Sequence, residues 1–224
     1  MIQRILDILF SGIALVALSP ILFPVLVLLK LTGEGEVFFA QKRVGRNGGL
    51  FNLLKFATML KDSPNIGTGT VTLKDDPRVL PLGKILRQTK INELPQLINI
   101  MKGDMSVVGP RPQTPRCFEV FPVEYQQIIK RVRPGLSGLG SVVFRDEENI
   151  LSENDASINF YDNVIAPYKG EVESFYVHSQ DIFTYFKIIL ATIWVVLFPK
   201  SKIVKRLFPK LPSPPESLMK KLNL

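Results

Sequence analysis

The sequence of 224 residues contains a single cysteine, Cys117, and a single histidine, His178. One cysteine excludes a disulfide within the chain, and one residue of each kind makes a Cys/His zinc site implausible. A serine or cysteine nucleophile activated by histidine would have to use His178. Carboxylates, lysines and arginines therefore have to carry any chemistry, which points to phosphate chemistry assisted by a hard cation such as Mg²⁺.

Acidic residues are in the minority, with 20 Asp and Glu against 28 Lys and Arg and a formal net charge of +8. A basic chain suits nucleic acid, anionic lipid and phosphorylated substrates equally well, so charge alone does not choose among them. A platform for stacking nucleic-acid bases needs regularly spaced aromatic residues along a basic groove. The sequence around Phe38, Phe39 and Phe51 lacks that spacing, so we expect no nucleic-acid partner.

Charged residues are missing from residues 8–29, a run of roughly 22 residues that is long enough to cross a bilayer. Ser19-Pro20 lies at its centre and Pro24 follows, and each proline weakens a helix at its position. A cleaved signal peptide does not fit, because the apolar part is too long and no small-residue cleavage site precedes Lys30. Two alternatives remain: a straight span with a tolerated kink, and a re-entrant membrane helix broken at Ser19-Pro20 into two half-helices.

Basic residues on both sides of this run favour the re-entrant alternative. Arg4 precedes the run, and Lys30, Lys42, Arg43 and Arg46 follow it. Because basic flanks tend to stay in the cytoplasm, both ends are expected on that side. The sequence thus predicts a re-entrant membrane hairpin over 1–32, a cytoplasmic domain over 33–200 and a basic, proline-rich tail over 201–224.

The predicted fold class is α+β, mostly helical with a small antiparallel sheet. Apolar and polar residues alternate around RNGG within residues 36–59, which predicts two short strands and a turn. Pro81 is predicted to open a helix, and residues 134–144 (PGLSGLGSVVF) to form a turn and a strand. The apolar residues 182–198 fit either an amphipathic helix in the membrane interface or a core helix.

The stretch QTKINELPQLINIMKGDMSVVGPRP, residues 88–112, contains a short predicted helix. Pro95 suits the first turn of a helix, and Gly103 suits the left-handed residue that closes one. Asn92 and Glu93 then lie at the N-terminal end of this helix. Helix N-termini carry unpaired N–H groups and a partial positive charge, which together favour phosphate.

Charged residues near this helix complete a candidate phosphate site. Glu93 can bind Mg²⁺, and Arg87 and Arg111 can hold phosphate oxygens by bidentate hydrogen bonds. Lys55 is a further candidate. The structural alternatives are a solvated surface charge for Arg87 and Lys55 and a salt-bridge partner for Arg111.

The GPRP motif favours a fixed arginine. Pro110 and Pro112 restrict the backbone on both sides of Arg111, so its side chain loses little entropy when it binds a ligand.

These segments together resemble the bacterial sugar transferase family, the monotopic phosphoglycosyl transferases. The resemblance covers about residues 1–200 and includes the proline-containing apolar run. It rests on three further segments in the family's order: VFFAQKRVGRNGGLFNLLKFATM, DPRVLPLGKILRQTKINELPQLINIMKGDMSVVGPRP and PGLSGLGSV.

The resemblance implies an enzyme that transfers a sugar-1-phosphate from a UDP-sugar to a polyprenol phosphate, with Mg²⁺ as cofactor and release of UMP. Such a reaction initiates exopolysaccharide, O-antigen or glycoprotein glycans at the cytoplasmic face of the bacterial inner membrane. Further partners would be membrane lipid, other glycan-assembly enzymes or a second copy of the chain. With the residues above, it assigns catalytic positions to Lys55, Asn92 and Glu93, the metal site to Glu93, and substrate binding to Arg87, Pro110, Arg111, Pro112 and Arg145.

Position 92 departs from the family pattern, in which an aspartate before Glu-Leu-Pro-Gln takes the phosphosugar covalently. A carboxamide is a poor nucleophile at phosphorus. Three interpretations remain: Glu93 or a carboxylate of residues 145–148 replaces the nucleophile, the lipid phosphate attacks directly while Asn92 orients an oxygen, or the protein is an inactive membrane-bound scaffold. Ala57, where the family usually carries arginine, and the acidic residues after Arg145 are further departures.

Overall fold

The computed structural model describes residues 2–66, 76–152, 158–199, 201–219, 221–222 and 224. The strands are β1 (Phe38–Val44), β2 (Leu50–Phe56), β3 (Ser106–Val108) and β4 (Gly135–Ser137). The helices are α1 (Ile2–Leu31), α2 (Pro81–Gln88), α3 (Gln96–Lys102), α4 (Pro115–Glu119), α5 (Val123–Ile129), α6 (Leu139–Val143), α7 (Glu147–Ser152), α8 (Ile158–Phe160), α9 (Ala166–His178), α10 (Ile182–Leu197), α11 (Ile203–Leu207) and α12 (Glu216–Met219). Shorter turns are the 3-10 turns η1 (Arg46–Gly48), η2 (Ser63–Asn65) and η3 (Ile91–Glu93) and the π-helical turn η4 (Tyr161–Ile165).

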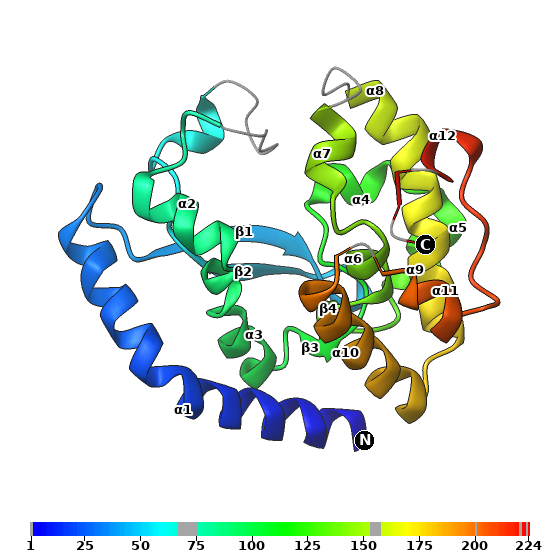
Figure 1. Cartoon of the computed structure of the whole chain (residues 1–224), viewed down its shortest axis with the longest axis horizontal. Coiled ribbons are helices and arrows are strands. Elements are labelled where there is room, and N and C mark those ends of the chain that lie inside the picture. The colour runs from blue at the N-terminus through cyan, green and yellow to red at the C-terminus, as the bar shows by residue number, and fades with distance from the viewer. Residues whose placement is uncertain (1, 67–75, 153–157, 200, 220, 223) are drawn as a thin grey trace.

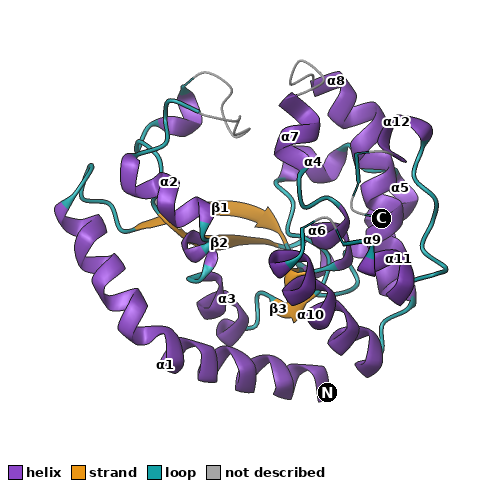
Figure 2. Cartoon of the chain, viewed as in Figure 1, coloured by secondary structure: helices purple, strands orange, loops and turns teal. Residues whose placement is uncertain are grey.

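The predicted architecture is confirmed. Helices make up most of the molecule, and the antiparallel hairpin of β1 and β2 lies at its centre (Figures 1 and 2). In this hairpin Phe39 pairs with Lys55. Asn47 in the connecting turn has φ 60°, a left-handed value that asparagine tolerates better than most residues. Because side chains alternate along a strand, Arg43 shares the partly buried face of β1 with Phe39.

The two helices predicted from proline and glycine are also confirmed. α2 begins at Pro81, and α3 follows Pro95 and ends before Gly103, whose φ of 93° is the left-handed conformation that closes a helix. Lys90 has φ 60° at the end of α2, where the chain turns into η3. η3 packs against both α2 and β2, which places the Asn-Glu pair beside the hairpin.

The glycine-rich segment after α5 differs from its prediction. β4 pairs in parallel with β3, with Ser106 opposite Gly135. Of the turn and strand predicted over residues 134–144, the strand is limited to β4, and the residues that follow form α6. Val142 and Val143 favour strands by propensity, but both are buried in the main core, and burial on a helix overrides that preference.

The main hydrophobic core lies among the helices that follow the hairpin in the chain, α9 and α10 above all, and Leu6 and Phe10 of α1 pack against it (Figure 1). Val172 and Tyr176 of α9 and Ile188 of α10 are fully or almost fully buried in it.

The C-terminal segment packs against this core in its described part. Val204 and Leu218 are fully buried. The Tyr168 hydroxyl donates to the Pro212 carbonyl at 2.8 Å. The described residues 201–219 of the basic, proline-rich segment thus lie along the helical body.

α1 is one continuous helix that contains both prolines and changes direction along its length (Figure 1). Pro20 lacks the N–H that would reach the Val16 carbonyl, and the Ser19 hydroxyl donates to that oxygen instead at 2.7 Å. The sequence predicts a break into two half-helices at Ser19-Pro20, whereas the structure has a bend in an uninterrupted helix. Proline is the ordinary cause of such a bend.

Both ends of α1 contact the same body. Near the C-terminal end, Val25 and Leu29 pack against Phe56 of β2 and Leu86 of α2. At the opposite end Leu6 and Phe10 pack against the main core, and polar contacts are added to them.

Asp7 is the centre of these polar contacts, with 2 % of its surface exposed. Its carboxylate accepts hydrogen bonds from the Ser106 hydroxyl (2.8 and 2.9 Å), the Val107 N–H (2.9 Å) and the Tyr185 hydroxyl (3.1 Å). Arg4 donates to two carbonyls at the C-terminal end of α3, at 2.6 and 2.9 Å. A buried carboxylate is tolerated when its oxygens are satisfied in this way, so Asp7 joins α1 to β3 and α10.

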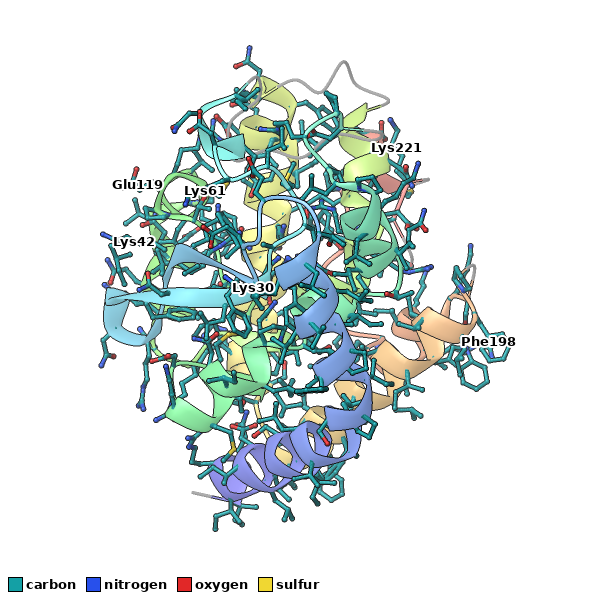
Figure 3. The ribbon with its side chains drawn as sticks, turned by 90° about the vertical axis from the view of Figure 1, so that its left-hand side faces the viewer. Lys30, Lys42, Lys61, Glu119, Phe198 and Lys221 are labelled. Carbon is teal, nitrogen blue, oxygen red and sulfur yellow. The ribbon has the colours of Figure 1, made fainter. Side chains whose placement is uncertain are left out.

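α1 and α10 carry large exposed apolar surfaces. α1 is long and apolar enough to cross a membrane, and 11 % of its most apolar window is buried. α10 combines the two alternatives left open for it, since Ile188 lies in the core while Phe183 and Leu197 are 74 % and 66 % exposed. Figure 3, turned so that α1 faces the viewer, shows Phe198 after α10 projecting away from the body.

Asp7→Ala should destabilise the protein because it leaves the Val107 N–H and the Tyr185 hydroxyl without their acceptor. We expect a loss of about 2–4 kcal/mol in the free energy of unfolding. Asp7→Asn keeps one acceptor oxygen and should lose less. Thermal unfolding of the full chain in detergent measures both, and an Asp7→Ala protein as stable as wild type would contradict this role.

Candidate functional site

Three predicted site residues from separate segments meet at one carboxylate. Lys55 Nζ lies 3.1 Å from Glu93 Oε1, and Arg111 Nη2 lies 3.8 Å from the same oxygen. β2 supplies Lys55, η3 supplies Glu93, and the loop after β3 supplies Arg111. The Arg111 side chain is 40 % exposed, twice as much as the other two, so the cluster is open to solvent on its side.

Burial and charge act in opposite directions on Glu93. Burial raises the pKa of its carboxyl, but Lys55, Arg111 and Lys90 outweigh burial and hold that pKa at about 2. Burial lowers the pKa of the Lys55 ammonium, with Glu93 opposing the change and Arg111 adding to it. Glu93 is therefore an anion at neutral pH inside an excess of positive charge, an arrangement that attracts phosphate.

Backbone contacts hold the GPRP segment that carries Arg111. The Gly109 N–H donates to the Ser137 carbonyl (2.9 Å), and the Pro110 carbonyl accepts from the Gly135 N–H (2.8 Å). A Cβ atom on Gly135 would lie 2.0 Å from the Gly109 nitrogen, so the two segments approach this closely because position 135 has no side chain. The arginine thus projects from a fixed backbone.

Arg43 is a member of the cluster that the sequence did not single out as a site residue. Its guanidinium donates to the Pro112 carbonyl (3.0 Å) and to the Gln41 side chain, while its Nε is buried without a partner among the described residues. Burial, followed by the charge of Arg111, lowers the pKa of Arg43 to about 10. In the sequence Arg43 resembles a basic membrane flank, and only its place in the strand alternation could have indicated that it points inward.

Asn92 lies next to Glu93 and is 6 % exposed. Its Oδ1 is buried and has no hydrogen-bond partner in the described part of the chain. Few buried polar atoms in folded proteins are unpaired, and a ligand that donates a hydrogen bond is one explanation for such an atom.

The other two predicted arginines have different surroundings. Arg87 is on α2, which packs against η3, and its guanidinium contacts the Met59 sulfur at 3.9 Å. Arg145 is exposed after α6. Of the acidic residues that follow it, Glu147 binds Lys169 Nζ at 2.7 and 2.9 Å. The substrate-binding roles of Arg87 and Arg145 stay predictions.

The residues around Glu93 fit a magnesium ion that shares its coordination with a substrate. Mg²⁺ keeps several waters and is commonly held by one or two carboxylates together with substrate phosphates. Glu93 supplies one carboxylate, and the described residues contain no group of three or more His, Cys, Asp and Glu side chains that would hold a metal alone. This donor set suits an ion that arrives with a phosphorylated ligand.

Glu93→Gln should destabilise the protein in a pH-dependent way. Because folding lowers the Glu93 pKa from 4.5 to about 2, its contribution is fully present above about pH 4.5 and is lost as the pH falls toward 2. We expect the variant to lose about 1–3 kcal/mol of unfolding free energy at pH 7 and much less at pH 2.5, by denaturant titration. Glu119→Gln, at an exposed position, is the control. A loss that is the same at both pH values would contradict this assignment.

Comparison with known proteins agrees with the resemblance. The family model described as Bacterial sugar transferase matches residues 1–199. Exopolysaccharide production protein ExoY of Sinorhizobium fredii (strain NBRC 101917 / NGR234) is 36 % identical over 159 residues, covering 65 % of this chain and 70 % of ExoY.

Longer proteins match through part of their length. The UDP-N-acetylgalactosamine-undecaprenyl-phosphate N-acetylgalactosaminephosphotransferase of Aeromonas hydrophila is 38 % identical over 161 residues, covering 69 % of this chain and 38 % of that protein. The UDP-glucose:undecaprenyl-phosphate glucose-1-phosphate transferase of Escherichia coli (strain K12) is 34 % identical over 167 residues, covering 71 % and 35 %. With these matches and the geometry around Glu93, the chain belongs to the bacterial sugar transferase family.

Proposed function

We propose that this protein is a sugar-1-phosphate transferase that moves the group from a UDP-sugar to a membrane polyprenol phosphate and releases UMP. The observation that carries the proposal is the Glu93 carboxylate between Lys55 and Arg111. Relatives named for phosphotransfer to undecaprenyl phosphate support the acceptor. ExoY, named for exopolysaccharide production, supports a role at the start of surface-glycan synthesis.

The position of the cluster suits one water-soluble and one lipid substrate. Phe56, the residue after Lys55, packs against Val25 and Leu29 near the end of α1. The strand that carries Lys55 thus also contacts the helix whose exposed surface is most suited to lipid. A sugar nucleotide can reach Arg111 from water while a polyprenol phosphate keeps its chain in the bilayer.

In the proposed reaction, a phosphate oxygen of the acceptor forms a bond to the sugar-bearing phosphorus of the UDP-sugar. The bond from that phosphorus to the bridging oxygen breaks, and UMP leaves with the oxygen and its electron pair. Lys55 and Arg111 neutralise charge on the phosphate oxygens, and the fixed GPRP backbone keeps Arg111 in place for this task. A bound Mg²⁺ at Glu93 would supply further positive charge to the same oxygens.

We assign Asn92 an orienting role in direct transfer. Two of the carboxylates that could replace a nucleophile are engaged, Glu93 by Lys55 and Glu147 by Lys169. The unpaired Oδ1 of Asn92 can accept a hydrogen bond from a substrate hydroxyl. Phosphoryl transfer relies mainly on positioning and charge stabilisation, which this cluster supplies without a covalent intermediate.

We also propose that α1 is re-entrant and holds the body at the cytoplasmic face of the bacterial inner membrane. Asp7 near one end and Leu29 near the other contact the same body. A helix with its ends on opposite sides of a bilayer could not keep both contacts. The exposed apolar face of α10 would then lie in the interface beside it.

Purified full-length protein with polyprenol phosphate, Mg²⁺ and a panel of UDP-sugars should release UMP. Glu93→Gln and Arg111→Lys should lower the rate by about 100-fold or more, because each removes charge or geometry used at the phosphates. Glu119→Gln should react like wild type. Direct transfer further predicts ternary-complex kinetics and no labelled phosphosugar on the protein in a single turnover.

Three outcomes would contradict parts of this proposal. No UMP with any UDP-sugar would reject the activity. Ping-pong kinetics with a labelled wild-type protein would reject direct transfer. Activity that appears only in Asn92→Asp would favour the inactive, membrane-bound scaffold.

Cysteine labelling tests the re-entrant arrangement in a Cys117→Ser background. Ile2→Cys and Thr32→Cys, at exposed positions near the two ends of α1, should both react with an impermeant maleimide in inverted membrane vesicles and neither in intact spheroplasts. Val16→Cys, at an exposed apolar position between them, should react in neither. Labelling of the two ends from opposite sides would establish a spanning helix instead.

A further inference from the structure

Glu173 of α9 is a buried carboxylate that contacts the backbone of the GPRP motif. Only 1 % of the surface of Glu173 is exposed, and its Oε1 accepts a hydrogen bond from the Arg111 N–H at 2.9 Å. Pro110 and Pro112 have no N–H, so the Arg111 N–H is the one backbone donor within Pro-Arg-Pro. This N–H donates to Glu173. The carboxylate therefore acts on the backbone of the residue whose guanidinium faces Glu93.

The fit of Glu173 depends on a missing side chain. Gly140 lies on α6, and a Cβ atom there would be 2.3 Å from Glu173 Oε1 and 2.6 Å from its Cδ. Even alanine at this position would push the carboxylate away from Arg111. The glycine-rich segment after α5 thus also leaves room, at Gly140, for the contact between Glu173 and Arg111.

Other contacts surround this one without replacing it. The Tyr176 hydroxyl, one turn after Glu173, donates to the Val108 carbonyl at 3.2 Å. The Gln113 side chain donates to the Arg111 carbonyl at 3.1 Å. These bonds are between neutral groups, whereas an ionised Glu173 makes a charge-assisted bond, which is roughly twice as strong.

The charge of Glu173 is sensitive to pH in the physiological range. Burial raises the pKa of its carboxyl to about 7, although the N–H groups of Arg111 and Gly140 and the charges of Lys169 and Arg111 act to lower it. Lys169, one turn earlier on α9, is itself bonded to Glu147, and α6 contributes no charged residue to this contact. Glu173 Oε2 has no partner among the described residues, so a proton can reside there while Oε1 keeps its bond.

We propose that Glu173 is a positioning residue that fixes the Arg111 backbone through its carboxylate and weakens its hold when it takes up a proton, so that affinity for the sugar nucleotide falls as the pH drops through neutrality. This inference rests on the proposed function, in which Arg111 holds a substrate phosphate. It adds a residue on α9 that does not touch the substrate.

The coupling itself can be tested without turnover. Three Pro-Arg pairs occur in the chain, at Arg78, Arg111 and Arg116, so protein labelled with ¹³C-carbonyl proline and ¹⁵N-arginine gives three amide signals in a carbonyl-selected spectrum. In wild-type protein the Arg111 amide shift should change with a midpoint near pH 7. In Glu173→Gln, and in Gly140→Ala, where the carboxylate is displaced, that change should disappear.

Affinity measurements show what the coupling does. At pH 8, Glu173→Gln should bind the UDP-sugar about three- to tenfold more weakly than wild type, and at pH 5.5 the two should bind alike, because the wild-type carboxyl is then neutral as well. Glu171→Gln removes a carboxylate from the same helix and should behave like wild type. The variant is expected to fold. Because folding raises the pKa of the Glu173 carboxyl, its ionised form lowers the stability of the protein at any pH above the pKa of the unfolded chain. Glu173→Gln removes that cost at pH 8.

The outcomes separate this inference from the proposed function. An Arg111 amide that is insensitive to pH in wild type, or an affinity ratio that is the same at both pH values, would overturn the role of Glu173. Wild-type protein that shows the Arg111 titration but binds no UDP-sugar would support the Glu173–Arg111 coupling and reject the proposed substrate.

Discussion

The organisation of the molecule depends on one carboxylate shared by two cations. Lys55 and Arg111 both face Glu93, and Arg43 lies close enough for its pKa to respond to Arg111. Without an anion, three partly buried cations would repel one another and the contact among the segments that carry them would be weakened. With it, the hairpin, η3 and the GPRP loop form one surface that is still positive in excess. That remaining charge is what a phosphate would neutralise.

The same surface is fixed relative to the lipid-suited helix. Apolar contacts alone would hold α1 only weakly to the body in a membrane, because its apolar side chains are about equally stable in lipid. Asp7 changes this balance, since among the described residues its carboxylate accepts from donors on β3 and α10. At the other end, Leu29 packs on Phe56, the neighbour of Lys55. The distance between the cationic cluster and the lipid-facing side chains is therefore set by the fold.

Local sequence signals predicted the local structure well. Pro81, Pro95 and Gly103 marked helix limits that the structure confirms, because proline and glycine act through their own backbone conformation. Glu93 and Arg111 could be selected as charged residues next to such signals. Arg43 could not, because its inward direction depends on strand pairing and on the Pro112 carbonyl that it meets across the fold. Val142 and Val143 misled the strand prediction for the same reason: the core decides their conformation.

Glu173 and Gly140 are a further case of a contact that local sequence signals do not predict. Neither residue is near Arg111 in sequence, and a glutamate normally predicts a solvated position, because charged residues are rarely buried. Their contact arises only when α6 and α9 pack together and bring an acceptor to the single N–H of Pro-Arg-Pro. In the proposed direct transfer Asn92 supplies no covalent nucleophile, so the reaction would rely on placing both substrates correctly. In such a site, residues that hold an arginine backbone in position matter as much as the arginine itself.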